Sequence, residues 1–240
     1  MSSRADLLID WCGHDAVAYA CKQWHYSRSI PPPPHNRIGV WEGGQFIGVV
    51  LFARGANKNM LSPFGLTQIQ GCELVRIALN KHQWPVSRIV SISVAFLRRR
   101  CPGLRLVVSY ADPEQDHHGG IYQAGNWIYT GQTDDSTSYL APDGKIWHPR
   151  MVSANGRKPV FGQSRATWRY DQCQPIKLAG KHRYLMPLDG AMREEIAPLA
   201  KPYPKRVKQA TDGHHSSSGG AAPTRALQSV APHVALDNQP

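Results

Sequence analysis

The sequence predicts an α/β fold in which a mixed sheet is flanked by helices. Two observations carry this prediction: a hairpin pattern over residues 38–52 and a strand–helix–strand pattern over 73–110. The 240 residues suffice for one large domain or two small ones, and the sequence contains no internal repeat. Strands that alternate with helices in this order are typical of the α/β class.

The N-terminal part carries apolar residues at helical spacing. Over 5–24 they predict one or two short helices, with Gly13 as the break. The chain then reaches Trp24-His25-Tyr26-Ser27 and four prolines at 31–34, which forbid helix and form a stiff loop.

Three strands are expected next. Residues 38–41 and 45–52 should pair as a hairpin around Glu42-Gly43-Gly44, because glycines suit a tight turn between two apolar runs. The third strand is expected over 73–79.

A helix is predicted over 88–100, with Ser87 as its N-cap. Arg98, Arg99 and Arg100 complement the negative end of the helix dipole, and Cys101-Pro102-Gly103 ends the helix. Four residues share one face of this helix: Ile89, Ile92, Ser93 and Phe96.

The segment after this helix predicts two more strands and a short helix. Residues 104–110 form a near-continuous apolar run, as in a strand buried on both faces, and Ala111-Asp112-Pro113 ends it. A short helix is expected within 119–125, and a further strand begins at 127–130.

Composition excludes several classes of protein. No apolar run approaches the roughly 18 residues that a membrane helix needs. Arg4, Asp6, Asp10 and Asp15 stand where a signal peptide would be apolar, so the protein is expected to stay in the cytoplasm. Five cysteines without a C-x-x-C pair suit a reducing compartment and argue against a thiolate zinc site.

The formal net charge of +11 predicts a polyanionic partner, and the charge is unevenly spread. Residues 1–149 carry +3, 150–208 carry +9 and 209–240 carry −1. We therefore expect a core domain over 1–149 and a basic, aromatic-rich extension of it over 150–208. The last segment, rich in Gly, Ser, Ala and Pro, is expected to be a disordered tail.

The basic extension interleaves cations with aromatic residues and glycines, as a surface that binds nucleic acid requires. The alternative is that these cations are solvated and pack their stems around core aromatics. The candidates for phosphate contact are Arg157, Lys158, Arg165, Arg169, Lys181 and Arg183.

The strand–loop–helix unit over 73–100 places a helix N-terminus outside the end of a strand, where backbone N–H groups attract anions. No Asp or Glu occurs between Val75 and Tyr110. With Tyr122 and Gly125-Asn126-Trp127 after it, this unit resembles the GNAT acetyltransferase superfamily, in which it cradles the pyrophosphate of acetyl-CoA. The loop 82–87 lacks the glycines that this superfamily usually has there.

Several longer motifs resemble the Mom family of bacteriophage DNA-modification proteins, over about residues 20–190. They stand in this order: Trp24-His25-Tyr26-Ser27, the stretch from Cys72 to Ala78, Ser109-Tyr110-Ala111-Asp112-Pro113, the stretch from His118 to Tyr129, and Lys181-His182-Arg183-Tyr184.

The Mom resemblance implies a GNAT-like enzyme that depends on acetyl-CoA and iron. It would convert the exocyclic amine of adenine in double-stranded DNA to a methylcarbamoyl form, which shields phage DNA from host restriction in the host cytoplasm. By the same resemblance, His25, Asp112 and Tyr122 are expected at the iron and active-site positions. Tyr26 joins them as a catalytic candidate, and Arg76, Ser87 and Arg88 are expected at the acetyl-CoA positions.

Each candidate also has an independent interpretation. Imidazole, carboxylate and phenolate groups are acceptable ligands for a non-haem iron. The structural alternatives are His25 in an aromatic cluster, Asp112 as a turn former before Pro113, and Tyr122 as a core residue. Because the target amine is hidden in the base stack, base flipping is expected, with Trp24, Tyr26 or Trp127 stacking on the adenine.

Two other functions stay open from the sequence. One is an ordinary GNAT acetyltransferase that acts on a protein or small-molecule amine. The other is a non-catalytic DNA-binding protein of a phage. Mass spectrometry of nucleosides distinguishes all three functions.

Overall fold

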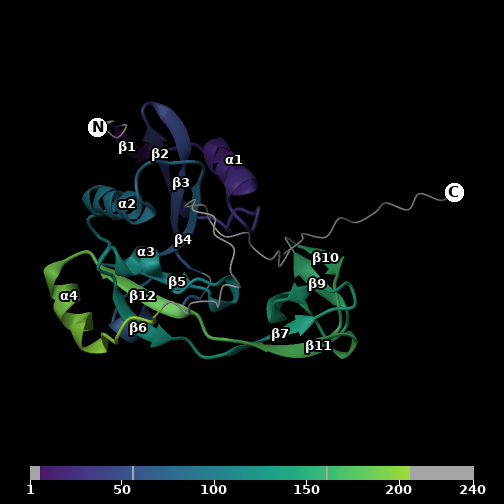
Figure 1. Ribbon diagram of the computed structural model, residues 1–240. Coiled ribbons are helices and arrows are strands. Elements are labelled where there is room, and N and C mark those ends of the chain that lie inside the picture. Colours follow the sequence, from purple (N-terminus) through teal and green to yellow (C-terminus); the bar gives the residue numbers. More distant parts are fainter. Residues whose placement is uncertain (1–5, 56, 161, 206–240) are drawn as a thin grey trace, which may run out of the picture. The chain divides into compact units, whose positions relative to one another are not determined.

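The computed structural model describes residues 6–55, 57–160 and 162–205. The expected tail, 209–240, lies outside the described residues. The described chain forms two compact units, 6–134 with 180–205, and 135–179 (Figure 1). The expected division after residue 149 therefore falls inside the second unit, and the basic segment is shared between the two units.

The first unit is built on a seven-stranded mixed sheet in the order β1-β2-β3-β4-β5-β12-β6. β4 and β5 pair in parallel, whereas the other neighbours are antiparallel. The strands are β1 (Leu7–Trp11), β2 (His35–Glu42), β3 (Gln45–Ala53), β4 (Gly71–Leu79), β5 (Leu106–Ala111), β6 (Ile128–Gln132) and β12 (His182–Pro187). The helices are α1 (His14–Trp24), α2 (Val86–Arg100), α3 (Gly120–Gln123) and α4 (Gly190–Ile196).

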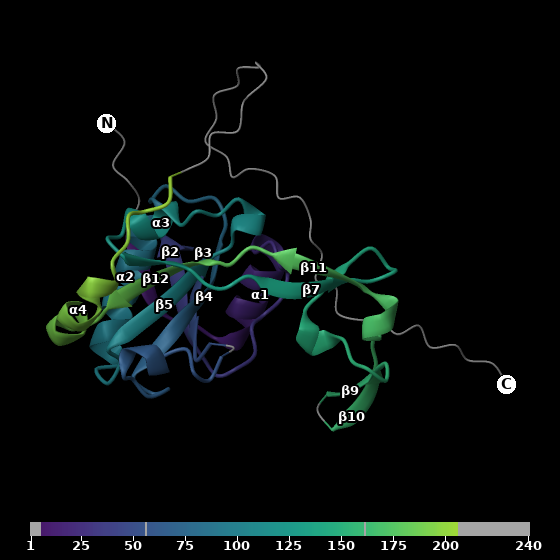
Figure 2. The same ribbon diagram turned by 90° about the horizontal axis from the view of Figure 1, so that it is seen from below.

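Helices cover both faces of this sheet. Side chains of α2 and α3, including Ile89 and Tyr122, pack in one buried cluster with Phe52 and Val107 of the sheet. Side chains of α1 pack with Val49 and Leu51 on the other face, where alternate residues of β3 point. α4 packs on that second face as well and lies beside β12 in both views (Figure 1, Figure 2). The predicted mixed sheet flanked by helices is confirmed.

The first predicted helix is wrong in its first half. Leu7–Trp11 is an edge strand that pairs with β2, and α1 begins only at His14. Ile9 is buried whereas Leu8 and Asp10 are exposed, so burial alternates along the segment as in a strand. A five-residue segment is too short for its apolar spacing to distinguish the two periods.

The helix predicted over 88–100 is confirmed as α2, but the predicted cap is wrong. The helix begins at Val86, and Pro85 is the N-cap residue, which has no side chain that accepts a hydrogen bond. Ser87 therefore lies inside the first turn. Among the described residues, no helix has both the length and the apolar composition needed to cross a membrane.

β4 and β5 pair over only part of their length. The parallel ladder joins Gly71–Glu73 to Leu106–Val108 and ends there within the described residues, although β4 continues to Leu79 and β5 to Ala111. Groups between the diverging strands must find partners outside the ladder. The hydroxyl of Ser109 and the carbonyl of Leu74 lie at this point, and the candidate site is built beside them.

The second unit has its own small core. A three-stranded sheet runs in the order β11-β7-β8, and a hairpin joins β9 and β10. Ala141, Val152 and Cys173 form the buried centre, with Trp147 and Trp168 packed against it. The strands are β7 (Ser136–Leu140), β8 (Ile146–Trp147), β9 (Arg157–Val160), β10 (Gln163–Ala166) and β11 (Gln174–Leu178).

Candidate active site

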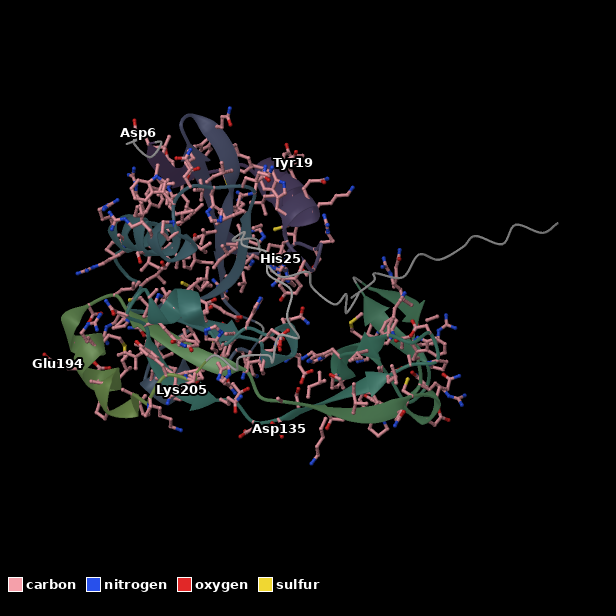
Figure 3. The ribbon with its side chains drawn as sticks, viewed as in Figure 1. Asp6, Tyr19, His25, Asp135, Glu194 and Lys205 are labelled. Carbon is pink, nitrogen blue, oxygen red and sulfur yellow. The ribbon has the colours of Figure 1, made fainter. Side chains whose placement is uncertain are left out.

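His25 lies where the chain leaves α1 (Figure 3). Its backbone N–H caps the helix by donating to the carbonyl of Cys21, and its side chain is only 7% exposed. The backbone N–H of Ser27 donates to Nδ1 of His25 over 3.1 Å, and the Ser27 hydroxyl lies 2.8 Å from the same atom. Because Nδ1 accepts from a backbone N–H, the proton of the neutral imidazole sits on Nε2.

Burial keeps this imidazole neutral. Desolvation, followed by the positive charge of Arg76 and by His117, lowers the pKa of His25 to about 3. His25 therefore offers a hydrogen-bond donor, Nε2–H, throughout the neutral pH range.

The lowered pKa predicts that stability falls in acid. The unfolded chain protonates this histidine below about pH 6.5, whereas the folded chain resists protonation down to about pH 3. Unfolding should therefore become easier as the pH falls through this window, by about 2 kcal/mol between pH 7 and pH 5 from His25 alone. Urea unfolding at the two pH values should show this loss reduced in His25→Gln and unchanged in His14→Gln, which alters an exposed histidine. An equal loss in both variants would contradict the assignment.

Tyr122 is buried beside the divergence of β4 and β5. Its hydroxyl lies 2.8 Å from Oγ of Ser109, and that Oγ lies 3.1 Å from the carbonyl oxygen of Leu74. A serine hydroxyl has one hydrogen, so Ser109 donates either to the Leu74 carbonyl, and then accepts from Tyr122, or to the Tyr122 oxygen, which leaves the phenol hydrogen available to a ligand. Burial raises the pKa of Tyr122 to about 12, although the Ser109 bond opposes the rise. The phenol therefore keeps its proton at neutral pH.

Tyr26 links His25 to the other aromatic groups of the site. Its ring centroid lies 4.3 Å from that of His25 and 6.2 Å from that of His117. After burial, electrostatic interaction with Tyr26 is among the causes that raise the pKa of Tyr122, so the two side chains are near each other. With 50% of its surface exposed, Tyr26 is open to a ligand from solvent.

Arg76 completes what we call the His25–Tyr122 cluster, namely His25, Tyr26, Arg76, Ser109 and Tyr122. Its Nη1 donates to the carbonyl of Val75 over 2.7 Å. Its Nε is buried and has no hydrogen-bond partner among the described residues. A buried N–H donor on a cation is rarely left without an acceptor. The Arg76 Nε–H therefore suits an anionic or carbonyl oxygen that a ligand would bring.

Gly119 fixes the start of α3 and hence the position of Tyr122. Its φ is +83°, and an added Cβ would lie 2.3 Å from the ring of Tyr184. The Tyr184 hydroxyl donates to the carbonyl of His118 over 2.6 Å. Only glycine combines this backbone conformation with so close a ring.

The Asp112 carboxylate is bonded to two groups of the protein itself. Its carboxylate accepts from the backbone N–H of Glu114, over 3.1 Å, in the turn after β5. Its Oδ2 forms an ion pair with Nζ of Lys181 at 2.8 Å. These contacts match the structural alternative, a turn-forming aspartate.

The expected iron ligands His25, Asp112 and Tyr122 do not fit a metal site as they lie. A histidine that binds a metal usually donates its other ring N–H, whereas Nδ1 of His25 accepts a hydrogen bond. The Tyr122 hydroxyl is hydrogen-bonded to Ser109, and the Asp112 carboxylate is paired with Lys181. No group of three or more His, Cys, Asp and Glu side chains suited to a metal ion occurs in the described part of the chain.

The expected acetyl-CoA residues lie in two places. Arg76 is on β4, whereas Ser87 and Arg88 are on the first turn of α2. In the loop before α2, the buried carboxylate of Glu42 accepts the backbone N–H groups of Gln83 and Trp84 at 2.9 and 3.0 Å.

The first turn of α2 contains no acid, and its first N–H groups have no intrahelical acceptor. A phosphate of the cofactor therefore fits this turn. It does not fit the preceding loop, because Glu42 already binds the amides there.

Burial decides which of the three aromatic candidates could stack on a flipped base. Trp127 is fully buried, with its ring centroid 5.0 Å from that of Tyr122, so it cannot stack on an extruded adenine. Trp24 is half-buried against Tyr19 and Phe46. Tyr26 is the exposed aromatic residue that contacts His25.

The six phosphate-contact candidates come from both units. Lys181 and Arg183 belong to the first unit, and the other four belong to the second. Lys181 pairs with Asp112, and Arg183 donates to the Thr130 hydroxyl.

In the second unit, Arg169 pairs with Asp171, and Lys158 donates to the carbonyl of Arg150. Arg157 and Arg165 are exposed and have no ion pair among the described residues.

Three residues of the site were missed from the sequence. Ser109 carried a usable signal, since a polar residue inside an apolar strand is rarely buried without a partner. Ser27 and Glu42 carried none: Ser27 is an ordinary loop residue, and Glu42 reaches a loop 41 residues away.

The chain belongs to the Mom protein family, which matches residues 6–205. Among curated relatives, methylcarbamoylase mom of Escherichia phage Mu is 28% identical over 194 residues, which cover 75% of this chain and 76% of the relative.

Among solved structures with a similar fold is spermidine N-acetyltransferase from Vibrio cholerae in complex with CoA and spermine. It aligns with this chain at a TM-score of 0.41 and 10% identity, and the alignment covers 76% of this chain and 95% of the acetyltransferase. An N-acetyltransferase from Staphylococcus aureus has a TM-score of 0.41 and 11% identity, covering 77% of this chain and all of that one. Neither likeness bears on activity.

Proposed function

We propose that this chain is a transferase that uses acetyl-CoA to convert adenine in double-stranded DNA to its methylcarbamoyl form, which protects phage DNA from restriction in the host cytoplasm. One observation carries the proposal: the chain matches the Mom family over 6–205 and is related to the phage Mu methylcarbamoylase over three quarters of each chain. The His25–Tyr122 cluster offers the hydrogen-bond donors that such a transfer needs.

The proposed roles follow from the protonation of each side chain. Acetyl-CoA, when bound, would supply a two-carbon unit activated as a thioester. Replacing the thioester by an amide requires an ammonia donor and releases CoA thiol, and joining the acetyl methyl carbon to the adenine nitrogen with loss of a C–H and an N–H hydrogen requires a two-electron oxidant as co-substrate. Ser87 and Arg88 hold its phosphate at the first turn of α2. Nε–H of Arg76 and Nε2–H of His25 are donors for a carbonyl oxygen, which they polarise by hydrogen bonding. Tyr122, protonated and held by Ser109, donates its proton to a group that gains negative charge.

Tyr26 is proposed to hold the target base. The exocyclic amine of adenine is inaccessible within a duplex, so the base must be flipped out before reaction. Tyr26 is half exposed and in ring contact with His25, which suits it to stack on the extruded adenine.

DNA binding is proposed to use the β9–β10 hairpin. Lys158 and Arg165 lie directly opposite each other in this hairpin, and because the Lys158 ammonium donates to the carbonyl of Arg150, the exposed guanidinium of Arg165 is the one proposed to meet a phosphate.

Arg157→Ala and Arg165→Ala should each reduce the slope of log affinity against log salt by about 1 for duplex DNA. Arg169→Ala should change the slope less, because Asp171 already pairs with Arg169. Fluorescence anisotropy across a salt series measures all three slopes. Equal slopes for the three variants and the unaltered protein would refute this surface.

The proposed function is tested by mass spectrometry of nucleosides from DNA of cells that express the chain. Methylcarbamoyl adenine should appear only on expression. An acetylated product without any DNA change would instead favour an ordinary acetyltransferase. If the protein bound DNA but the DNA stayed unmodified, the result would favour a non-catalytic DNA-binding protein.

A further inference from the structure

A cavity of about 510 Å³ lies in the first unit, and no side chain of the His25–Tyr122 cluster lines it. It is lined by α2 from Ser91 to Arg99, by Gly125 after α3, by the end of β12 and by Arg193 of α4. Its size falls within the range of pockets that bind small organic ligands. No residue of the proposed catalytic or DNA-binding machinery lines it.

Three arginines from two helices line this cavity. Arg98 and Arg99 come from α2, and Arg193 comes from α4. All three are exposed, and none has an ion pair among the described residues. Arg105 forms ion pairs with the neighbouring carboxylates of Asp189 and Glu195, at 2.9 and 3.2 Å, and the Asp189 carboxylate also interacts electrostatically with Arg98. The four arginines at and beside the cavity, Arg98, Arg99, Arg105 and Arg193, outnumber these two carboxylates, so its surroundings have an excess of positive charge.

Helix dipoles explain only part of this arrangement. A cation in the last turn of a helix is favourable, which accounts for Arg98, Arg99 and Arg100 on α2 and for Arg193 on α4 as separate features. The dipole does not require two helices to direct their cations to one cavity. Arg100 shows the difference, because it belongs to the same turn of α2 but packs over the ring of Phe96 at 5.5 Å.

The rest of the lining is mostly apolar. Val94 comes from α2, and Met186, Pro187 and Leu188 come from the end of β12 and the residue after it. An inorganic anion gains nothing from such a surface, whereas the flat apolar body of a nucleotide does. Guanidinium groups match phosphate oxygens in pairs. The two halves of the cavity thus suit the two halves of one ligand.

The strand register separates this cavity from the His25–Tyr122 cluster. β12 runs antiparallel to β5, with Pro187 opposite Leu106 at the start of β5 and His182 opposite Ala111 at its end. The cavity lies at the start, whereas Ser109 lies near the end. Arg98 is also twelve residues along α2 from Val86, about 18 Å from the turn proposed for the cofactor phosphate.

We propose that this cavity is a second binding site, for a nucleoside monophosphate or diphosphate. The phosphate lies among Arg98, Arg99 and Arg193, and the nucleoside lies on the apolar surface. The site stands independently of the proposed transferase activity.

Calorimetric titration with AMP and ADP tests the proposal directly. AMP should bind saturably, and adenosine or inorganic phosphate alone should each bind at least about tenfold more weakly. The double variant Arg98→Ala/Arg193→Ala should lose at least about tenfold in AMP affinity. Ala95→Trp, which fills the cavity without changing charge, should abolish binding.

Two matched variants serve as controls for the titration. Arg100→Ala removes the same charge from the same turn but not from the cavity, so AMP affinity should be unchanged. Arg88→Ala alters the cofactor end of α2 and should also leave AMP affinity unchanged. Absence of saturable AMP binding, an equal loss in Arg100→Ala, or a loss confined to Arg88→Ala would overturn the proposal. A double variant that weakens only duplex DNA binding would also overturn it, since the arginines would then contact the DNA backbone.

Discussion

Replacing Tyr122 by phenylalanine is expected to slow DNA modification by about 10²- to 10⁴-fold, the usual contribution of a positioned proton donor. The substitution removes one hydroxyl, which bonds to Ser109, and keeps the ring in the core. Ser109 retains its bond to the Leu74 carbonyl, so no buried donor is left without an acceptor. The nucleoside assay, run as a time course, measures the rate, and near-ultraviolet circular dichroism reports the packing of the ring.

Tyr129→Phe is the matched control for this prediction. Tyr129 is also buried, but its hydroxyl bonds to Nδ1 of His182 at 3.0 Å, outside the His25–Tyr122 cluster. The rate of DNA modification by Tyr129→Phe should stay close to that of the unaltered protein. If Tyr122→Phe were fully active, the phenol would be a packing residue and its proposed role would be lost.

Replacing Trp127 by alanine is expected to lower the free energy of unfolding by about 3–5 kcal/mol. Trp127 is fully buried and packs against Tyr122, and a large cavity would form because the neighbouring strands cannot close over it. Urea unfolding with fluorescence detection measures the loss.

Trp11→Ala provides the comparison. Trp11 is 41% exposed on an edge strand and contacts the edge of Phe96, so its loss should cost only about 1 kcal/mol. A cost for Trp127→Ala as small as that for Trp11→Ala would show that Trp127 does not stabilise the core.

Most of the first unit could be predicted from the sequence because its elements have strong local signals. The hairpin of β2 and β3 has glycines at its turn, and α2 has a wide apolar face ended by Pro102-Gly103. The second unit could not be separated, because its boundaries at 134 and 180 lack a change in charge or composition. It is defined by β7 pairing with β11, which lie more than 30 residues apart.

The candidate site was predictable in residue type but not in protonation. The motifs select His25, Tyr26, Arg76 and Tyr122, and the structure provides ring or electrostatic contacts that link them. The ring tautomer of His25 depends on the backbone N–H of Ser27, which no side-chain pattern reveals.

The role of Asp112 likewise depends on a long-range partner. Lys181 lies 69 residues further along the sequence, and only the pairing of β5 with β12 brings it to the carboxylate. The expected iron site was based on the ligand types of His25, Asp112 and Tyr122, and ligand types alone do not reveal a long-range ion pair such as that of Asp112 with Lys181.

Isotope tracing tests the central claim most directly, namely that an acetyl unit and an adenine of DNA meet at the His25–Tyr122 cluster. The purified protein is incubated with duplex DNA, a DNA-free cell extract that supplies the second nitrogen and the two-electron oxidant, and acetyl-CoA labelled with ¹³C in its acetyl group. We expect the label in the modified adenine, and its loss in Tyr122→Phe but not in Tyr129→Phe. Modified adenine without label, or equal labelling with both variants, would contradict the claim.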